Sequence, residues 1–449
     1  MSVYKKYDRY KDSGVEWIGE VPEHWDVIPL KRLTTMVNRG ISPTYVSESD
    51  IKIINQACIY WDGLRLENIK YQQNDIEPYT YKGNLVFGDV LVNSTGTGTL
   101  GRAQVFNLDE KYIADSHVTI VRTIYDNLNP KYLFFLLQTP YYQGFIYSAI
   151  VTGATNQIEL SREGLRNTCI IHPTYKEQKA IADFLDQKTS EIDSLIADKE
   201  KLIELLQEKR QAIISEAVTK GLDKNVKMKD SGIDLIGEVP EHWEALPLKR
   251  IIKDFESGVS VNAIDELAEE GEYGILKTSC VFNDEFDPKE NKVILDEVEL
   301  RNARLNPKKD CIIISRMNTP ELVGASGYVS EDHKNLFLPD RLWQTVYWNK
   351  ENISCLWLSY VLNSHFFRGQ VSSVATGTSD SMKNVSKNDY LSIIIVLPPF
   401  EEQTQIALAL KSTLEIINQV EIEIKEIVTK LKEYRQSLIS EAVTGKIMV

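Results

Sequence analysis

Residues 176–219 read KEQKAIADFLDQKTSEIDSLIADKEKLIELLQEKRQAIISEAVT, and residues 401–444 carry the same kind of pattern again. The first stretch contains neither Gly nor Pro, so no residue in it interrupts a helix. At about 1.5 Å per residue, each stretch predicts a helix roughly 65 Å long. Two such helices in one chain are the feature around which the fold is organised.

Apolar residues in both stretches recur at alternating spacings of three and four, which is typical of a coiled-coil seam. Lys199 and Lys209 fill the skipped positions of the first stretch. Because a long helix cannot bury such a seam alone, we predict that the two helices pack against each other. The alternative is two ordinary amphipathic helices on separate domains. The predicted seam residues are Ile192, Leu195, Leu202, Leu206 and Ile213 in the first helix, and Ile417, Val420, Ile424, Ile427, Leu431 and Leu438 in the second.

The chain also repeats itself outside these stretches. Residues 11–33 (KDSGVEWIGEVPEHWDVIPLKRL) return almost unchanged as residues 229–251 (KDSGIDLIGEVPEHWEALPLKRI). Residues 210–219 (RQAIISEAVT) return as residues 435–444 (RQSLISEAVT). A repeat of this kind shows a duplicated unit. Since the segments between the repeats differ, we infer that the framework is shared while the two copies meet different targets.

The remaining segments predict two β-rich globular domains. Each has short β-branched or aromatic runs bounded by Gly, Asn or Asp, and one apolar helix, over residues 130–150 in the first copy and 353–371 in the second. The predicted fold class is α+β, with two mixed, β-rich domains separated by two long helices packed as an antiparallel coiled coil. The predicted boundaries are 1–175 for the first domain, 176–222 for the first long helix, 223–400 for the second domain and 401–449 for the second long helix.

Bulk properties narrow the class of protein. Length predicts two to four domains, and no apolar run reaches the roughly 18 residues of a membrane span. The five scattered cysteines have no metal-binding spacing and indicate reduced thiols in a cytosolic protein. The net charge of −14 weighs against a simple nucleic-acid binder, whose surface is usually basic.

No catalytic or metal site is assembled by the sequence. Gly96, Gly98 and Gly101 form a GxGxxG string, but a strand-like run follows where a dinucleotide site needs a helix. A tight hairpin is therefore favoured over a cofactor loop. The six histidines show no ligand spacing, and His24 and His242 lie beside tryptophans in the repeated GEVPEHW segment, which favours packing.

The repeats, the SxxxTPELVG stretch (315–324) and the Pro-x2-EQ-x2-IA start of the second long helix together resemble the specificity subunit of type I restriction–modification enzymes. The resemblance covers essentially the whole chain. It implies that each domain is a target-recognition domain for one half of an asymmetric, bipartite DNA sequence, and that the coiled coil sets the spacing and docks the methyltransferase subunits. The start of the first long helix departs locally, with HPTYKEQ in place of PPFEEQ.

The partners that the resemblance implies are double-stranded DNA, two methyltransferase (modification) subunits and two restriction/translocase subunits, with no membrane. The chain itself is expected to be non-catalytic and cytoplasmic, with no cofactor and no metal. S-adenosylmethionine, ATP and Mg would bind to the partner subunits. The net negative charge then weighs less against DNA binding, because partner subunits that close round the duplex would supply part of the binding.

Base edges are contacted by polar side chains on exposed loops, which selects two loops in each domain. The candidates in the first domain are Ser94, Thr95, Thr97, Arg102, Asn156 and Gln157; those in the second are Ser315, Arg316, Asn318, Thr378, Ser379, Lys383 and Asn384. Two rival functions remain: a protein-interaction scaffold without a DNA role, which explains the acidity but not the divergent domains, and a stand-alone enzyme, for which no constellation is found.

Overall fold

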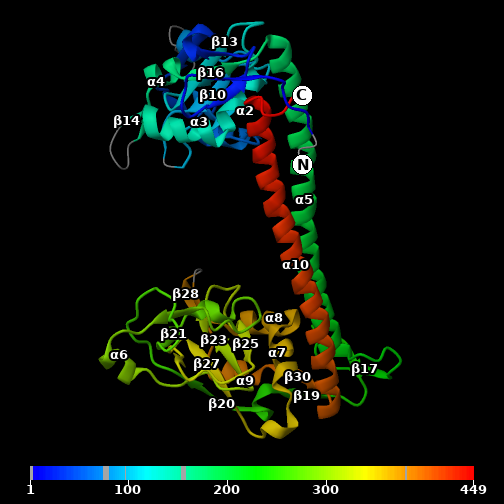
Figure 1. The fold of residues 1–449 in the computed structure, drawn as a ribbon. Coiled ribbons are helices and arrows are strands. Elements are labelled where there is room, and N and C mark those ends of the chain that lie inside the picture. The colour runs from blue at the N-terminus through cyan, green and yellow to red at the C-terminus, as the bar shows by residue number, and fades with distance from the viewer. Residues whose placement is uncertain (1–3, 74–79, 97, 153–157, 380–381) are drawn as a thin grey trace. The chain divides into compact units, whose positions relative to one another are not determined.

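The computed structural model describes residues 4–73, 80–96, 98–152, 158–379 and 382–449. The chain divides into two compact units, one formed by Met1–Glu200 with Lys425–Val449 and the other by Lys201–Ile424. Each unit combines one globular domain with a part of both long helices (Figure 1). In the described part of the chain, no helix has the length and apolar character needed to cross a membrane.

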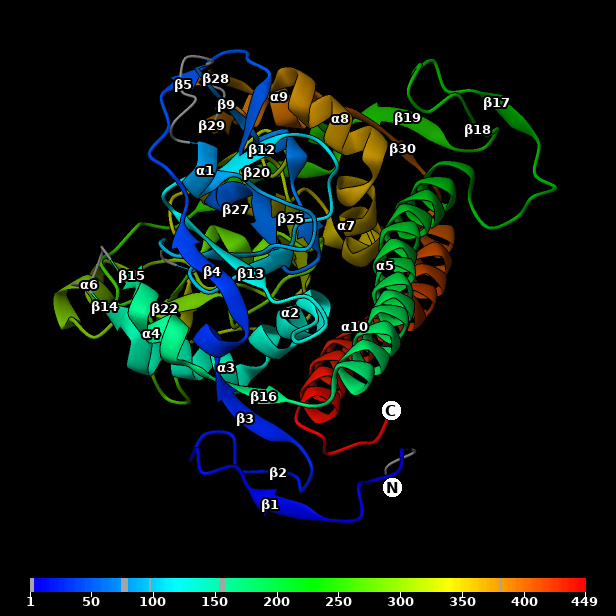
Figure 2. The same ribbon diagram turned by 90° about the horizontal axis from the view of Figure 1, so that it is seen from above.

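The first domain is built on two four-stranded sheets and a few short pairs. One sheet has the order β11-β10-β13-β4 and the other β12-β6-β9-β5. Figure 2 shows β4 and β13 side by side, in agreement with their antiparallel register. The described strands are β1 (Tyr10–Asp12), β2 (Glu20–Pro22), β3 (Asp26–Pro29), β4 (Thr34–Arg39), β5 (Tyr45–Val46), β6 (Ile51–Ile54), β7 (Ile59–Tyr60), β8 (Gly63–Leu64), β9 (Lys70–Gln72), β10 (Val90–Asn93), β11 (Ala103–Val105), β12 (Tyr112–Ala114), β13 (Val118–Thr123), β14 (Val151–Thr152), β15 (Glu159–Leu160) and β16 (Cys169–His172).

The second domain repeats this plan. Its four-stranded sheet has the order β20-β27-β23-β25, which matches β4-β13-β10-β11 strand for strand. A parallel pair, β21 with β26, takes the place of β6 with β12. The described strands are β17 (Met228–Asp230), β18 (Glu238–Pro240), β19 (Glu244–Pro247), β20 (Ile252–Ser257), β21 (Gly274–Leu276), β22 (Asn291–Val293), β23 (Cys311–Ser315), β24 (Met317–Asn318), β25 (Ser326–Val329), β26 (Leu336–Phe337), β27 (Leu342–Tyr347), β28 (Thr376–Ser379), β29 (Met382–Asn384) and β30 (Ile394–Leu397).

The apolar helix predicted in each domain is in fact two short helices. In the first domain these are α2 (Pro130–Gln138) and α3 (Pro140–Phe145), and in the second α7 (Cys355–Asn363) and α8 (His365–Val374). Thr139 and Ser364 have extended backbones at the breaks, and Thr139 caps the helix that follows. The prediction of one continuous helix was wrong because the backbone becomes extended at these two residues, whose hydroxyls donate to the carbonyls of Leu136 and Val361, and because Pro140 follows the first break.

The two long helices are α5 (Tyr175–Lys220) and α10 (Phe400–Val443). In the first unit they run antiparallel, since Asp193 binds Arg435 at 2.8 Å and Glu200 binds Lys432 at 3.0 Å. In the second unit Arg210 hydrogen-bonds Asn418 in the same antiparallel sense. The predicted fold class, an α+β chain with an antiparallel coiled coil, is confirmed.

The buried face of each long helix repeats at spacings of four and three along its whole length. Buried or half-buried positions are Gln178, Ala182, Leu185, Thr189, Ile192, Ile196, Lys199, Ile203, Leu206, Arg210, Ile213 and Ala217 in α5, and Gln403, Ala407, Leu410, Leu414, Ile417, Glu421, Ile424, Val428, Leu431, Arg435, Leu438 and Ala442 in α10. Each of these α5 positions has an α10 counterpart 225 residues later. The same offset relates the repeated segments 210–219 and 435–444.

Four of the predicted seam residues lie outside this face. Leu195, Leu202, Val420 and Ile427 are 49, 38, 37 and 41 % exposed. The true seam passes one residue later, through Ile196, Ile203, Glu421 and Val428. The three-four spacing by itself fits the predicted seam and the observed seam equally well. The choice between them is made where the first turn of each helix packs on its own domain through Gln178 and Gln403. The other predicted positions, Ile192, Leu206, Ile213, Ile417, Ile424, Leu431 and Leu438, are buried or half-buried as predicted.

The repeated GEVPEHW segment holds the start of each long helix. In the first unit, the buried Trp25 indole donates to the Glu177 carboxylate at 3.2 Å, and His24 Nε2 lies 2.8 Å from the same oxygen. Partial burial alone would raise the pKa of Glu177, but hydrogen bonds from His24, Thr174 and Trp25 hold it below its ordinary value. Trp243 and His242 bind Glu402 in the same way in the second unit, at 3.1 and 2.8 Å. The packing role predicted for His24 and His242 fits these contacts.

A glycine with positive φ follows the end of each long helix, in the left-handed conformation that such ends favour. Gly221 (φ +73°) closes α5, and a Cβ there would lie 3.3 Å from the Trp243 ring. Gly445 (φ +71°) follows α10, and its Cβ would lie 2.9 Å from Trp25. In each unit, one tryptophan therefore contacts the end of one long helix and the first turn of the other.

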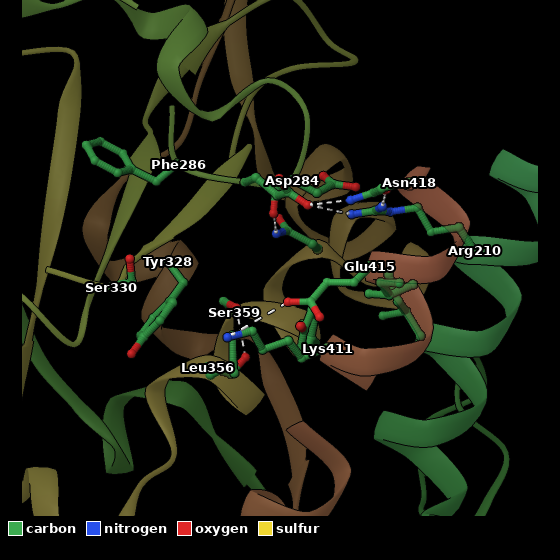
Figure 3. Close-up of a pocket in the computed structure, with 15 residues that line it drawn as sticks. Arg210, Asp284, Phe286, Tyr328, Ser330, Leu356, Ser359, Lys411, Glu415 and Asn418 are labelled. Carbon is green, nitrogen blue, oxygen red and sulfur yellow. Dashed lines mark hydrogen bonds and ion pairs between the residues drawn. The ribbon is translucent and has the colours of Figure 1, made fainter. Parts of the chain in front are cut away.

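A cavity of about 330 Å³ lies where the helix pair meets the second domain, and Figure 3 shows residues that line it. Arg210 and Asn418 project from the helices toward Glu285, at 3.4 and 3.1 Å, and Gln211 donates to Asp284 at 3.0 Å. Burial raises the pKa of Asp284. Since its charged side chains are paired within the lining, we interpret this cavity as part of the joint between helix pair and domain.

Candidate nucleic-acid interface

In the second domain, the structure joins the two loops selected from the sequence into one small sheet. Its strand order is β24-β29-β28, with Met317 opposite Asn384 and Asn318 opposite Lys383. The Val385 amide donates to the Arg316 carbonyl at 3.1 Å, which extends the pairing to the end of β23. Arg316, Asn318, Lys383 and Asn384 are half-buried side chains carried by these strands and their flanks.

The first domain joins its two loops in the same way. Thr95 forms a bridge with Glu159, β15 pairs with β14, and the Leu160 amide donates to the Ser94 carbonyl at 2.8 Å. These bonds match those of the second domain, so Ser94 corresponds to Arg316, Thr95 to Met317 and Glu159 to Asn384. The same backbone arrangement therefore carries different side chains in the two domains.

A turn before the central strand β13 or β27 completes each site. In the first domain the Ser94 amide donates to the His117 carbonyl at 2.8 Å, and in the second the Arg316 amide donates to the Arg341 carbonyl at 3.1 Å. His117 and Arg341 are both exposed. Sequence reasoning missed them because the turn becomes part of the site only through its pairing with a strand end more than 20 residues away in the chain.

A glycine in each domain allows another segment of the chain to pass close to the residue before this turn. A Cβ on Gly40, which follows β4, would lie 2.0 Å from the Ala114 carbonyl oxygen; on Gly258, which follows β20, it would lie 1.6 Å from that of Leu338. No other residue fits at either position without displacing the backbone. This close approach fixes the turns 115–117 and 339–341 against their sheets.

The two sites differ in charge. In the first domain Arg39 pairs with Glu159 at 3.1 Å, the Thr95 hydroxyl lies 2.8 Å from His117 Nδ1, and burial raises the pKa of Asp115. In the second, Arg316 lies 3.9 Å from Asp340, which also accepts a hydrogen bond from Ser260. Within the described residues, the buried Arg316 Nε and Asn384 Oδ1 have no partner. Donors and acceptors of this kind recognise base edges.

Several predicted contact residues are placed elsewhere. Ser94 and Ser315 are fully buried, so the prediction that their side chains contact bases is corrected: they lie inside the sheet and cannot reach a ligand. Arg102 stacks on the Tyr60 ring at 5.0 Å and lines a hollow beside Lys432, apart from Thr95. Thr97, Asn156 and Gln157 lie outside the described residues, and Thr378 and Ser379 are placed only by their backbone in β28. For Thr95, Arg316, Asn318, Lys383 and Asn384, DNA contact stays a prediction.

The fold and the two sites define a duplicated two-domain protein in which one framework presents two different surfaces. The family described as the type I restriction modification DNA specificity domain matches residues 22–205 and 240–428. The chain belongs to this family, that of the type I restriction–modification specificity subunits, as the repeats indicated, and each domain is one target-recognition domain.

Similar proteins agree over nearly the full length. The chain is 27% identical to the putative type I restriction enzyme MjaX specificity subunit of Methanocaldococcus jannaschii, over 96% of each. It is 24% identical to the EcoKI specificity subunit of Escherichia coli, covering 96% of this chain and 90% of that one. A solved chain described with the complex assembly and conformational transition of the type I restriction–modification system has a TM-score of 0.71 at 15% identity, covering 95 and 99%, which shows the shared fold.

Proposed function

We propose that each domain recognises one half of an asymmetric, bipartite DNA target, while the paired helices set the gap between the half-sites and dock two methyltransferase subunits. The chain supplies specificity and is not itself catalytic. S-adenosylmethionine, and ATP with Mg for two restriction/translocase subunits, bind to those partners.

The observation that carries this proposal is the pair of equivalent sites with unlike side chains. The backbone pairing around Ser94 and around Arg316 is the same, yet the sites present His117 and Glu159 in one domain and Arg341 and Asn384 in the other. Because bases differ in the donors and acceptors that they present in the major groove, the two domains should prefer different half-sites. Such a target is asymmetric although the framework is duplicated.

Docking is supported by the apolar residues that lie beside the buried seam. Leu195 and Ile427 are exposed in the first unit, and Leu202 and Val420 in the second. Val420 and Ile427 follow Leu195 and Leu202 by the same 225 residues that relate the helix repeats. Two equivalent apolar patches on helices fit two copies of one partner, and exposed apolar surface of this kind marks protein contacts.

Substitutions at the exposed Leu195 and at the buried Ile196 allow an effect on docking to be distinguished from an effect on folding. Leu195→Asp and Ile427→Asp, combined with Leu202→Asp and Val420→Asp so that both patches are changed, are expected to abolish co-purification with the methyltransferase subunit while the thermal midpoint stays unchanged. Ile196→Ala is expected to lower the free energy of unfolding by about 2–4 kcal/mol, because Ile196 is only 8% exposed. Pull-down and thermal unfolding of both variants measure the two effects. Retained co-purification by the variant with all four substitutions would exclude these patches as the docking site.

The function is tested by mapping methylated adenines in the genome of a host that expresses this chain with its methyltransferase subunit. An asymmetric motif with two short half-sites and a fixed gap is expected. Absence of any motif, together with stable capture of other proteins, would favour the interaction scaffold instead.

Replacing residues 376–384 by the corresponding segment of a family member with another target is expected to change one half-site and leave the other unchanged. The segment carries Lys383 and Asn384 on β29, next to Arg316. Exchange of residues 229–251 for 11–33 is the matched control, since these are nearly identical framework and should leave both half-sites as they were. An unchanged motif after the first exchange would remove this segment from the interface.

A further inference from the structure

Arg341 is an exposed residue of the second site. It follows Asp340 in the turn before β27, and its carbonyl accepts the Arg316 amide at 3.1 Å, which places it beside the strand end that continues into β24. Its side chain is exposed. Within the described parts of the chain, no hydrogen bond or ion pair holds its guanidinium.

The neighbouring Arg316 is held more firmly. Its guanidinium lies 3.9 Å from Asp340, its side chain is 32% exposed, and its amide and carbonyl are both committed to the sheet. Arg316 is therefore held in place by its contacts within the site. The side chain of Arg341 is free to contact a ligand that binds next to Arg316.

The first domain presents a different side chain at the same place. The His117 carbonyl oxygen accepts the Ser94 amide just as the Arg341 carbonyl accepts the Arg316 amide, and His117 Nδ1 lies 2.8 Å from the Thr95 hydroxyl. A position with fixed backbone and exchanged side chain is where two copies of one domain would acquire different preferences.

We propose that Arg341 is a specificity-determining residue of the second domain and that its guanidinium contacts a guanine in the major groove of the half-site. This inference rests on the proposed function. Arginine forms two parallel hydrogen bonds with guanine O6 and N7, the commonest specific contact of this kind.

A base contact is favoured over a phosphate contact by the surroundings. Asp340, next to Arg341 and 3.9 Å from Arg316, has carboxylate oxygens of the kind that accept hydrogen bonds from an amino group of a base. Asn318 and Asn384, on the adjacent paired strands, add amide groups of the type that contact base edges. Acidic residues outnumber basic ones in this domain, which disfavours sequence-independent attraction.

The test is the methylated motif of the complete complex carrying Arg341→Ala or Arg341→Gln. The Ala variant is expected to lose discrimination at one guanine of one half-site, by roughly 5- to 150-fold, because a bidentate contact is worth about 1–3 kcal/mol. The Gln variant is expected to shift that position toward adenine, whose N6 and N7 suit an amide. Arg250→Ala is the control, since Arg250 is exposed in the same domain but repeats Arg32 of the shared framework.

The possible outcomes distinguish a failure of the inference about Arg341 from a failure of the proposed function of the chain. An unchanged motif in both variants, or methylation weakened equally at all sites without a change of base, overturns the role of Arg341 as a base contact. Loss of all methylation in the Ala variant, with an unaltered guanine in the Gln variant, also overturns it. Failure of the unmodified chain to direct any bipartite methylation would instead refute the proposed function.

Discussion

Trp243→Ala is expected to lower the free energy of unfolding of the second unit by about 3–5 kcal/mol, the cost typical of removing a fully enclosed aromatic side chain. Trp243 has no exposed surface, its indole donates to Glu402 at 3.1 Å, and its ring lies against Gly221 at the end of α5. One substitution thus loosens the first turn of α10 and the end of α5 together. Urea unfolding of the full chain, followed by circular dichroism, measures the change.

Trp348→Ala is the matched control for this experiment. Trp348 lies in the same unit but is 63% exposed; its indole N–H donates to the Lys249 carbonyl at 3.0 Å, and the Lys253 ammonium lies 5.5 Å from the centre of its ring. Its removal should cost about 1 kcal/mol or less. Equal losses for the two variants would contradict the anchoring role of Trp243, whereas an unchanged transition of the first unit, which retains Trp25, would support it.

Insertion of one heptad into both long helices is expected to abolish methylation of the original target and to create a target with a wider gap. We place the insertions after Glu200 and after Ile424, at the boundaries between the two compact units. Seven residues preserve the three-four spacing of the seam and add about 10.5 Å, so the gap can grow by at most about three base pairs at roughly 3.4 Å each. Mapping of methylated adenines gives both the bases and the gap.

The bases of both half-sites should remain unchanged, because neither domain is altered. A heptad inserted into α5 alone is the control: it leaves seven residues without a partner on α10 and is expected to prevent assembly. An unchanged gap in the chain with both insertions would show that the helix pair does not set the spacing.

The repeats in the sequence predicted the duplicated domains, the two long helices and the family, because these depend on periodicity and on near-identical segments within one chain. The seam was predicted with the correct spacing but the wrong phase at Leu195 and Leu202. Apolar residues stand at both 195 and 196, and at both 202 and 203. Spacing cannot choose between such neighbours, since a rigid helix takes its phase from its contacts with the domain.

The sequence by itself determined that one framework occurs twice, that a paired helix follows each copy, and that the two copies differ in what they present. Only the tertiary structure decided which side chains share a surface. It enclosed Ser94 and Ser315, brought Arg316 next to Asn384, and added His117 and Arg341 to the sites. The reason is that these neighbours meet through backbone hydrogen bonds between strand ends distant in the chain, and such pairings leave no mark in local sequence.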